Sequence, residues 1–383
     1  MGDVAILGAG VTPVSRKGGS LRDLALEASA GALKDAALDK VDGLFVGNYA
    51  GGEMAGQYNI GPLIADQLHL TPAPAMTIEA ACASGTAALH MAFLAVKSGL
   101  YDSILVTGVE HMTGVPTPEA TRILASASDR EHERDQGTTF TGLNALLLRA
   151  YLHAYNVDHA DLMRFAVNAH KNGMTSPHAV LKKAITLEEA MASPIVSDPL
   201  RLYDCSPLCN GSASVVVASE ELARGRDDAV WIRATAMTTD TMSFHDREDL
   251  LELRASTLAG RKAFAMAGWK PRDVDVFEVH DAFTIMTPLA LESLGLYARG
   301  QGWRAAADGD IALSGSTPIS TYGGLKSRGH PVGATGLYQL YESIQQLRGR
   351  AGPNQVPDAK RALVQNMGGP ASSVSVTLIE AAA

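Results

Sequence analysis

Two stretches of the chain, VDGLFVGN (Val41–Asn48) and VDVFEVHD (Val274–Asp281), align with each other without a gap. Each contains the run of apolar residues that is typical of a buried strand, and each follows an alanine-rich segment with helical spacing. Two further pairs recur downstream in the same order: GTAALHMAFLAVKSG (Gly85–Gly99) with GATGLYQLYESIQQLRG (Gly333–Gly349), and ILVTG (Ile104–Gly108) with ALVQN (Ala362–Asn366). This shared order predicts two copies of one α/β unit.

Strands and helices alternate around these segments. Short apolar runs predict strands at residues 4–7, 41–46, 103–108 and 214–218, and alanines and leucines at helical spacing predict a helix over 21–38. Such alternation favours a layered α/β fold in which helices cover a mostly parallel sheet.

The stretch 112–199 is richer in charged residues, His, Asn and Met than its surroundings, and it has helical pieces but no clear strand. A polar helical insertion between two sheet regions often carries substrate contacts. We therefore expect an N-terminal half made of residues 1–111 and 200–226, an insertion over 112–199, and a C-terminal half over 227–383.

Composition excludes several classes of protein. With 46% hydrophobic and 19% charged residues, the 383-residue chain has the apolar content of a folded protein rather than a disordered one. A net charge of −9 argues against nucleic acid as the main partner. No basic, apolar leader and no membrane-length apolar run is present, and three cysteines cannot form a disulfide framework. These features predict a cytoplasmic protein.

Cys82 is the first candidate for chemistry. It lies in TIEAACASGTAAL, where a strand-like run gives way to small residues and then to a helix. Unpaired N–H groups at a helix N-terminus lower the pKa of a thiol and stabilise an oxyanion, so we expect a reactive thiol there. The alternative is a small, buried, structural cysteine.

Two histidines are candidate partners for this thiol. His330 lies in SRGHPVGATGLY, in a turn fixed by Gly329 and Pro331, which suits a base held beside a nucleophile. His280 ends the strand VDVFEVHDAF, at the strand end where α/β folds place ligands. Alternatively, both are structural residues of a turn and a strand end.

Two other patterns carry no function. GAGVTP (Gly8–Pro13) begins like a dinucleotide-binding fingerprint, but Pro13 replaces its third glycine. Cys205 and Cys209 have no second pair of cysteines or histidines near them in sequence, so we expect no zinc site.

Five motifs occur in the order, and at about the intervals, found in the thiolase superfamily: CASGTAAL (Cys82–Leu89), GVEHM (Gly108–Met112), DCSPLCNGSA (Asp204–Ala213), EVHDAF (Glu278–Phe283) and GGLKSRGHPVGATG (Gly323–Gly336). The chain most resembles the sterol-carrier-protein-type and archaeal or bacterial acetyl-CoA acetyltransferase-like thiolases. The resemblance implies two duplicated βαβαβαββ halves packed back to back, with a helical loop-domain insertion in the first half.

The resemblance also implies roles for single residues. Cys82 matches the acylated nucleophile, His330 the histidine that takes its proton, and His280 the position that binds the thioester oxygen. The backbone N–H groups of Cys82 and Gly368 match an oxyanion hole. The implied activity is acyl transfer with a coenzyme A thioester as substrate and no permanently bound cofactor. Four residues in or near the insertion are candidates for the phosphates of coenzyme A: Lys171, Lys182, Lys183 and Arg201.

The chain departs from the family pattern at the second catalytic cysteine. Asn366 stands where most thiolases have that thiol, and Ala282 stands where the sterol-carrier-type branch supplies it instead. Removal of an α-proton from a thioester needs a positioned base, so His280 or His330 would have to do this work.

This gap leaves three alternatives open: a decarboxylating β-ketoacyl-synthase-like condensation, a retro-aldol cleavage, and a non-catalytic acyl-CoA-binding subunit. For partners, the resemblance implies a homodimer formed through the sheet edge of the first half, or a higher homo-oligomer. In some relatives it also implies a small zinc-ribbon/OB-fold subunit.

Overall fold

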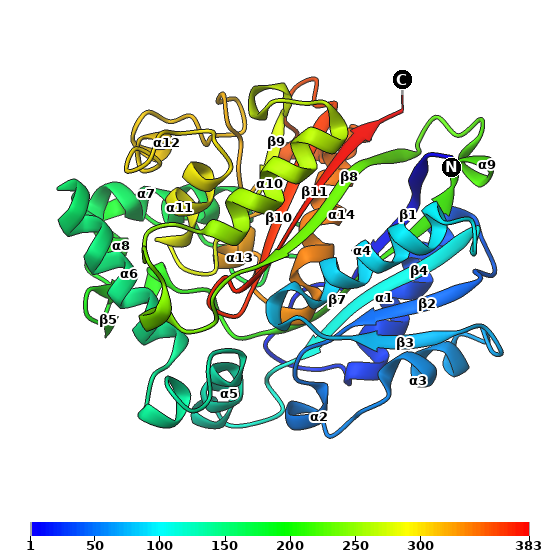
Figure 1. Ribbon diagram of the computed structural model, residues 1–383, viewed down its shortest axis with the longest axis horizontal. Coiled ribbons are helices and arrows are strands. Elements are labelled where there is room, and N and C mark those ends of the chain that lie inside the picture. Colours follow the sequence, from blue (N-terminus) through cyan, green and yellow to red (C-terminus); the bar gives the residue numbers. More distant parts are fainter. Residues whose placement is uncertain (1, 383) are drawn as a thin grey trace.

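A nine-stranded sheet runs through the computed structural model, which describes residues 2–382 (Figure 1). The strand order is β3-β2-β4-β7-β1-β8-β11-β10-β9. The strands are β1 (Val4–Val11), β2 (Gly43–Gly47), β3 (Ala75–Ile78), β4 (Ser103–His111), β7 (Asn210–Ser219), β8 (Val230–Thr239), β9 (Val276–Glu278), β10 (Arg361–Gly368) and β11 (Ser373–Ala381).

The two halves of this sheet repeat one strand order. The first half reads β3-β2-β4-β7-β1, and the second reads β9-β10-β11-β8 from its own edge. A parallel bridge from Ile319 to Phe277 of β9 marks the place of the missing counterpart of β3. The aligned stretches at Val41 and Val274 thus form equivalent strands, β2 and β9, which confirms the predicted duplication.

The expectation of a mostly parallel sheet was wrong. Among the named strands of the described residues, the β2–β3, β2–β4 and β9–β10 pairs are parallel, and antiparallel pairs outnumber them. The chain leaves β4, passes through the insertion and returns antiparallel as β7, whereas β10 and β11 form a hairpin. The halves then join by antiparallel pairing of β1 with β8. These pairings between distant segments leave no local trace in the sequence.

Helices form layers on both sides of the sheet halves (Figure 1). α1 (Leu21–Ala36) packs on strands of the first half and α10 (Arg254–Ala267) on strands of the second. α4 (Ser84–Lys97) and α14 (Thr335–Leu347) contact each other and strands of both halves, so they form the central layer. The remaining helices outside the insertion are α2 (Gly51–Met54), α3 (Ile60–Gln67), α9 (Glu220–Ala223), α11 (Met286–Ser293), α12 (Arg304–Ala307) and α13 (Gly324–Ser327).

Close approach of the two central helices brings the candidate residues together. A Cβ atom on Gly85, at the start of α4, would lie 2.8 Å from the Gly333 carbonyl oxygen, so only glycine permits this contact. Gly333 belongs to the turn before α14. The segment that carries Cys82 therefore meets the segment that carries His330.

The insertion is helical, as the sequence predicts. It contains α5 (Thr117–Leu124), α6 (Phe140–Tyr155), α7 (His159–Gly173) and α8 (Leu187–Met191). It also contains β5 (Ile195–Ser197), which pairs with β6 (Leu200–Arg201) in a small ladder that we did not expect. Figure 1 shows α6, α7 and α8 gathered beside the C-terminal half. We retain 112–199 as our proposal for the limits of this unit.

β1 extends past the predicted run, through Gly8 and Gly10. A Cβ atom on Gly8 would lie 2.2 Å from the Ala32 carbonyl oxygen, and one on Gly10 would lie 2.5 Å from that of Ala28. Close packing of α1 against β1 thus accounts for these glycines without a bound dinucleotide. Within residues 2–382, no helix is both long enough and apolar enough to cross a membrane.

Candidate active site

Cys82 sits on a strained elbow between β3 and α4. Ala81, the residue before it, has a φ of 50°, in the left-handed region that non-glycine residues avoid. The Ser84 hydroxyl donates to the Ala81 carbonyl at 2.6 Å and accepts from the Ala80 N–H at 2.9 Å. These contacts hold the sulfur at the start of α4, where the sequence placed it.

The structure brings Cys82, His280 and His330 together. The sulfur and one ring nitrogen of each histidine all lie within 4.8 Å of one another. The two imidazole rings are nearly perpendicular, with an interplanar angle of 85° and 5.0 Å between their centroids. The three residues come from the elbow before α4, the end of β9 and the turn before α14. Each half of the molecule therefore contributes to one cluster.

Hydrogen bonds orient His330 so that it can act as a base. Its backbone N–H donates to Cys209 Sγ at 3.0 Å, and its Nδ1 lies 2.7 Å from Thr335 Oγ1. Because the Thr335 hydroxyl donates its proton to the Pro331 carbonyl at 3.1 Å, it accepts from His330 Nδ1. The Nε2 atom of His330 then keeps a free lone pair.

Burial affects the pKa of the Cys82 thiol more strongly than the helix N-terminus does. Burial and then the nearby Glu110 carboxyl raise the pKa of Cys82 to about 12, against our expectation of a lowered value. Burial is also the largest cause that lowers the pKa of His330 well below 6.5, and it lowers the pKa of His280 to about 3. At neutral pH the site therefore holds a protonated thiol and two neutral imidazoles, and the thiol needs a base to become a nucleophile.

Glu110 connects the segments around the cluster through hydrogen bonds. Its carboxylate accepts hydrogen bonds from the backbone N–H groups of Tyr49 at 3.0 Å, Ala50 at 3.1 Å and Gly333 at 3.0 Å. One carboxylate thus fixes the loop after β2 and the turn after His330 in a single arrangement. The sequence analysis included Glu110 only as part of the GVEHM motif. Its structural role was not predictable, because its hydrogen-bond partners lie far away along the chain.

The glycines proposed to form the oxyanion hole lie where β10 ends. The backbone N–H groups of Gly369 and of Cys82 itself face the Cys82 thiol, and they partly offset the rise in its pKa. Gly368, the residue expected from the family, packs against the Ala80 carbonyl, which would lie 2.1 Å from a Cβ atom there. We therefore extend the proposed oxyanion hole from Gly368 and the Cys82 N–H to include Gly369.

A largely apolar cleft opens above the cluster, with an empty volume of about 1090 Å³ that includes some open solvent. Both halves and the insertion contribute to the walls. The apolar residues from the insertion and the second half include Met112, Leu124, Phe140, Leu147, Phe244, Phe283 and Met286. The described residues that line it do not include the four candidates for coenzyme A phosphates, which stay untested.

Cys205 is a wall residue that the sequence analysis set aside. It forms a backbone bridge with Phe283 and lines the same cleft as Cys82, next to Ala282. Its thiol donates to the Arg201 carbonyl at 3.6 Å, and burial raises its pKa to about 11. The sequence did not predict that Cys205 lies in this cleft, because no local pattern pairs residue 205 with residue 283.

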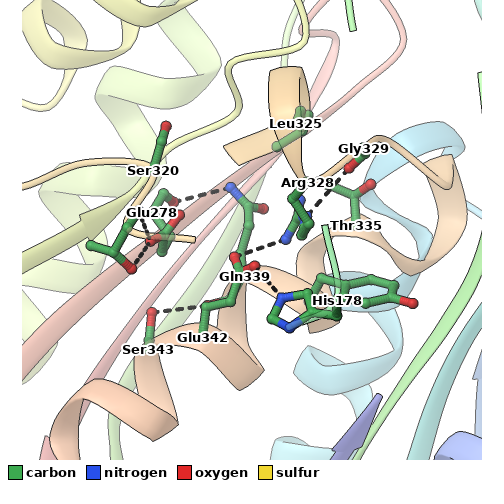
Figure 2. Close-up of polar contacts among 12 residues, drawn as sticks. His178, Glu278, Ser320, Leu325, Arg328, Gly329, Thr335, Gln339, Glu342 and Ser343 are labelled. Atoms are coloured by element: carbon green, nitrogen blue, oxygen red, sulfur yellow. Dashed lines mark hydrogen bonds and ion pairs between the residues drawn. The ribbon is translucent and has the colours of Figure 1, made fainter. Parts of the chain in front are cut away.

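Figure 2 shows a buried polar layer that contains Arg328, Glu342 and His178. Arg328, fully buried, donates from Nη1 to Glu342 Oε2 at 2.9 Å, and His178 Nε2 lies 2.8 Å from Glu342 Oε1. The positive charge of Arg328 adds to burial in lowering the pKa of both His280 and His330. Burial of the rings, with the added effect of Arg328, therefore favours the neutral form of both imidazoles.

Replacement of Glu342 by glutamine is expected to destabilise the fold by about 3 kcal/mol, because the buried charge of Arg328 would lose the carboxylate to which it donates a hydrogen bond. The measurement is the free energy of unfolding in urea. The double variant Arg328→Met with Glu342→Met removes both charges and is expected to recover most of the loss. Equal destabilisation in the single and double variants would show that the ion pair is not the cause.

Together, the duplicated halves, the central helix pair and the Cys-His-His cluster define a thiolase-fold protein with a cysteine just before a helix N-terminus. Family models agree with this class. "Thiolase, N-terminal domain" matches residues 4–221, and "Thiolase C-terminal domain-like" matches residues 236–381. The chain belongs to the thiolase family.

Particular relatives refine the comparison. An acetyl-CoA acetyltransferase of Methanothermobacter thermautotrophicus is 41% identical over 98% of this chain and 99% of its own. Sterol carrier protein 2 of Bos taurus is 32% identical over 95% of this chain and 70% of its own. A solved structure described as an Ltp2–ChsH2(DUF35) aldolase superposes with a TM-score of 0.84 at 25% identity, covering 99% of this chain and 98% of that one.

Proposed function

We propose that this protein is an acyltransferase that acts on acyl-CoA thioesters through an acyl-Cys82 intermediate, as an acetyl-CoA acetyltransferase does. The carrying observation is the cluster of Cys82, His280 and His330 within 4.8 Å at the floor of an apolar cleft. The 41% identity to an acetyl-CoA acetyltransferase over nearly the whole chain supports the same reaction.

The first half-reaction forms the acyl-enzyme. His330 Nε2 takes the thiol proton, and the Cys82 sulfur attacks the thioester carbonyl carbon. Backbone N–H groups of the oxyanion hole hold the developing negative charge, and each such donor typically contributes about 3 kcal/mol. The C–S bond to coenzyme A then breaks, and His330 returns its proton to the departing thiolate.

The second half-reaction forms the new C–C bond. A base removes an α-proton from a second acyl-CoA, and the resulting enolate oxygen is held near His280. The enolate carbon attacks the acyl-Cys82 carbonyl, the bond to the Cys82 sulfur breaks, and the sulfur regains a proton from the base. Run backwards with coenzyme A as the attacking thiol, the same steps cleave a β-ketoacyl-CoA.

The direct test is thiolysis of acetoacetyl-CoA by the purified protein. The assay measures the loss of acetoacetyl-CoA and the appearance of acetyl-CoA. Release of CO₂ from malonyl-CoA, with no thiolysis, would instead indicate a decarboxylating synthase. Binding of acyl-CoA with neither reaction would indicate a non-catalytic subunit.

A second candidate function is retro-aldol cleavage of a β-hydroxyacyl-CoA. It is favoured by the similarity to the aldolase structure, whose description also includes a DUF35 protein. Cleavage of a β-hydroxyacyl-CoA without uptake of free coenzyme A, or only after a small zinc-ribbon/OB-fold subunit is added, would support this reading.

The three free cysteines suit a reducing, cytoplasmic compartment for either reaction.

We also propose that the chain forms a homodimer through the β3 edge. β3 pairs only with β2 among the described residues, which leaves its outer edge open. Apolar side chains are exposed beside this edge: Met76 is 42% exposed, and Met91 and Leu94 on α4 are each 46% exposed. A second copy that pairs along β3 would cover them.

Replacement of Leu94 by glutamate is therefore expected to shift the protein from dimer to monomer, because it places a charge in the proposed interface. Sedimentation velocity at micromolar concentration measures the change. Leu258→Glu is the matched control, since Leu258 is 37% exposed on α10, away from β3. A wild-type monomer, or a Leu94→Glu dimer, would contradict this interface.

A further inference from the structure

Asn366, which stands where most thiolases have a second cysteine, is fully buried and contacts His280. Its Nδ2 atom lies 2.9 Å from His280 Nδ1 and 3.1 Å from Gln339 Oε1. The role of the asparagine depends on which of its side-chain atoms faces the histidine. Surrounding hydrogen bonds settle this.

Gln339 fixes the orientation of the Asn366 amide. The Gln339 Nε2 atom donates to the backbone carbonyls of Glu278 at 3.1 Å and Gln365 at 3.2 Å. Carbonyl oxygens only accept, so this nitrogen must face them, and the Gln339 oxygen must face Asn366. An oxygen there requires a donor from Asn366, which is Nδ2. Figure 2 shows Gln339 within the buried layer beside Arg328 and Glu342.

His280 Nδ1 therefore faces two donors. One is the Asn366 amide, and the other is the backbone N–H of Met367, at 3.4 Å. A ring nitrogen that accepts from donors carries no proton, so the proton of a neutral imidazole lies on Nε2. His330 has the opposite arrangement, because its Nδ1 donates to Thr335 and its Nε2 is free. The two histidines of the cluster thus differ in chemical role.

Building on the acyltransferase function above, we propose that Asn366 is a positioning residue that holds His280 in the Nε2-protonated tautomer. His280 then donates a hydrogen bond to the enolate oxygen and cannot take up a proton. His330 is the only base of the cluster and serves both half-reactions. The missing second thiol is not replaced by another base.

One base suffices because each half-reaction returns its proton. In the first, His330 passes the thiol proton of Cys82 to coenzyme A and is neutral again. In the second, it takes the α-proton and passes it to the Cys82 sulfur when the C–C bond has formed. Bonds and protons balance over the cycle without a further acid or base.

The first test reads the tautomers directly in the substrate-free protein. Two-bond ¹H–¹⁵N spectra of protein labelled in its histidine rings distinguish protonated from unprotonated ring nitrogens, and His280→Gln and His330→Gln assign the signals. The expected result is Nε2–H for His280 and Nδ1–H for His330. A proton on Nδ1 of His280 would overturn the proposal. This result stands whether or not the protein turns over acyl-CoA.

Variants of Asn366 test its part in this arrangement. Asn366→Asp presents an acceptor to Nδ1 and is expected to move the His280 proton to that atom. If this variant does not fold, Asn366→Ala is expected to give a second set of His280 signals, since only the weaker Met367 donor remains. An unchanged His280 tautomer in the folded variant would overturn the role of Asn366.

A kinetic test separates positioning from general damage. Exchange of the α-protons of acetyl-CoA in D₂O measures proton abstraction, and acylation of Cys82 measures the first half-reaction. In Asn366→Asp, exchange is expected to fall at least about tenfold more than acylation, since only exchange needs the donor at His280. Equal losses would indicate a structural role. Loss of exchange in Cys205→Ala would show that Cys205, not His330, is the second base.

Discussion

Replacing Cys82 with alanine is expected to lower turnover by at least about 10⁴-fold, because the covalent intermediate cannot form without the sulfur. Cys82 supplies the only thiol of the cluster, and a ring nitrogen of each imidazole lies within 4.8 Å of its sulfur. The readout is kcat for acetoacetyl-CoA thiolysis, together with the binding of acyl-CoA measured separately. Binding is expected to survive, since the cleft walls are unchanged.

Cys205→Ala is the matched control for loss of a thiol from the same cleft. Its thiol is turned to the Arg201 carbonyl, so no acyl-enzyme is expected on it. A Cys82→Ala variant that turned over substrate at a rate near that of the wild type would place the chemistry elsewhere.

Replacing His330 with alanine is expected to lower turnover by about 10²- to 10⁴-fold and to change its pH dependence. The thiol loses its base, while burial and Glu110 hold the pKa of Cys82 at about 12. At pH 7 nearly all of the thiol would then be protonated. The rate of acylation in the variant should therefore rise about tenfold with each pH unit up to about pH 10.

The wild-type enzyme should lack this steep rise. The pKa of His330 lies well below 6.5, so its basic form is present above that pKa and is lost only when the pH falls through it. Acylation by the wild type should thus be nearly flat from about pH 6.5 to about pH 8. The measurement is the rate of acyl-enzyme formation under single-turnover conditions. A steep rise in the wild type, or a flat profile in His330→Ala, would contradict the role of His330 as base.

Much of this site was predictable from the sequence because its parts are local. The small residues around Cys82 predict an elbow, the glycine and proline around His330 predict a turn, and the repeat places His280 at a strand end. The structure brings these residues together through the contact of Gly85 with Gly333, which joins the two halves.

Other properties depend on contacts between distant segments. The raised pKa of Cys82 reflects burial and Glu110, which lies on β4. The helix N-terminus alone predicts a lowered pKa, which is the wrong direction for this thiol. The orientation of His280 depends on Asn366 and, through it, on Gln339. The mixed sheet similarly depends on pairing of β1 with β8 across the two halves. No residue pattern within one segment carries this information.

The most direct test of the central claim is the mass of the intact wild-type chain after mixing with acetyl-CoA and quenching in acid. We predict a gain of one acetyl group, located by peptide mapping on the peptide that contains Cys82, and no gain in Cys82→Ala. A wild-type chain that is never acylated, or is acylated on another residue, would contradict the account.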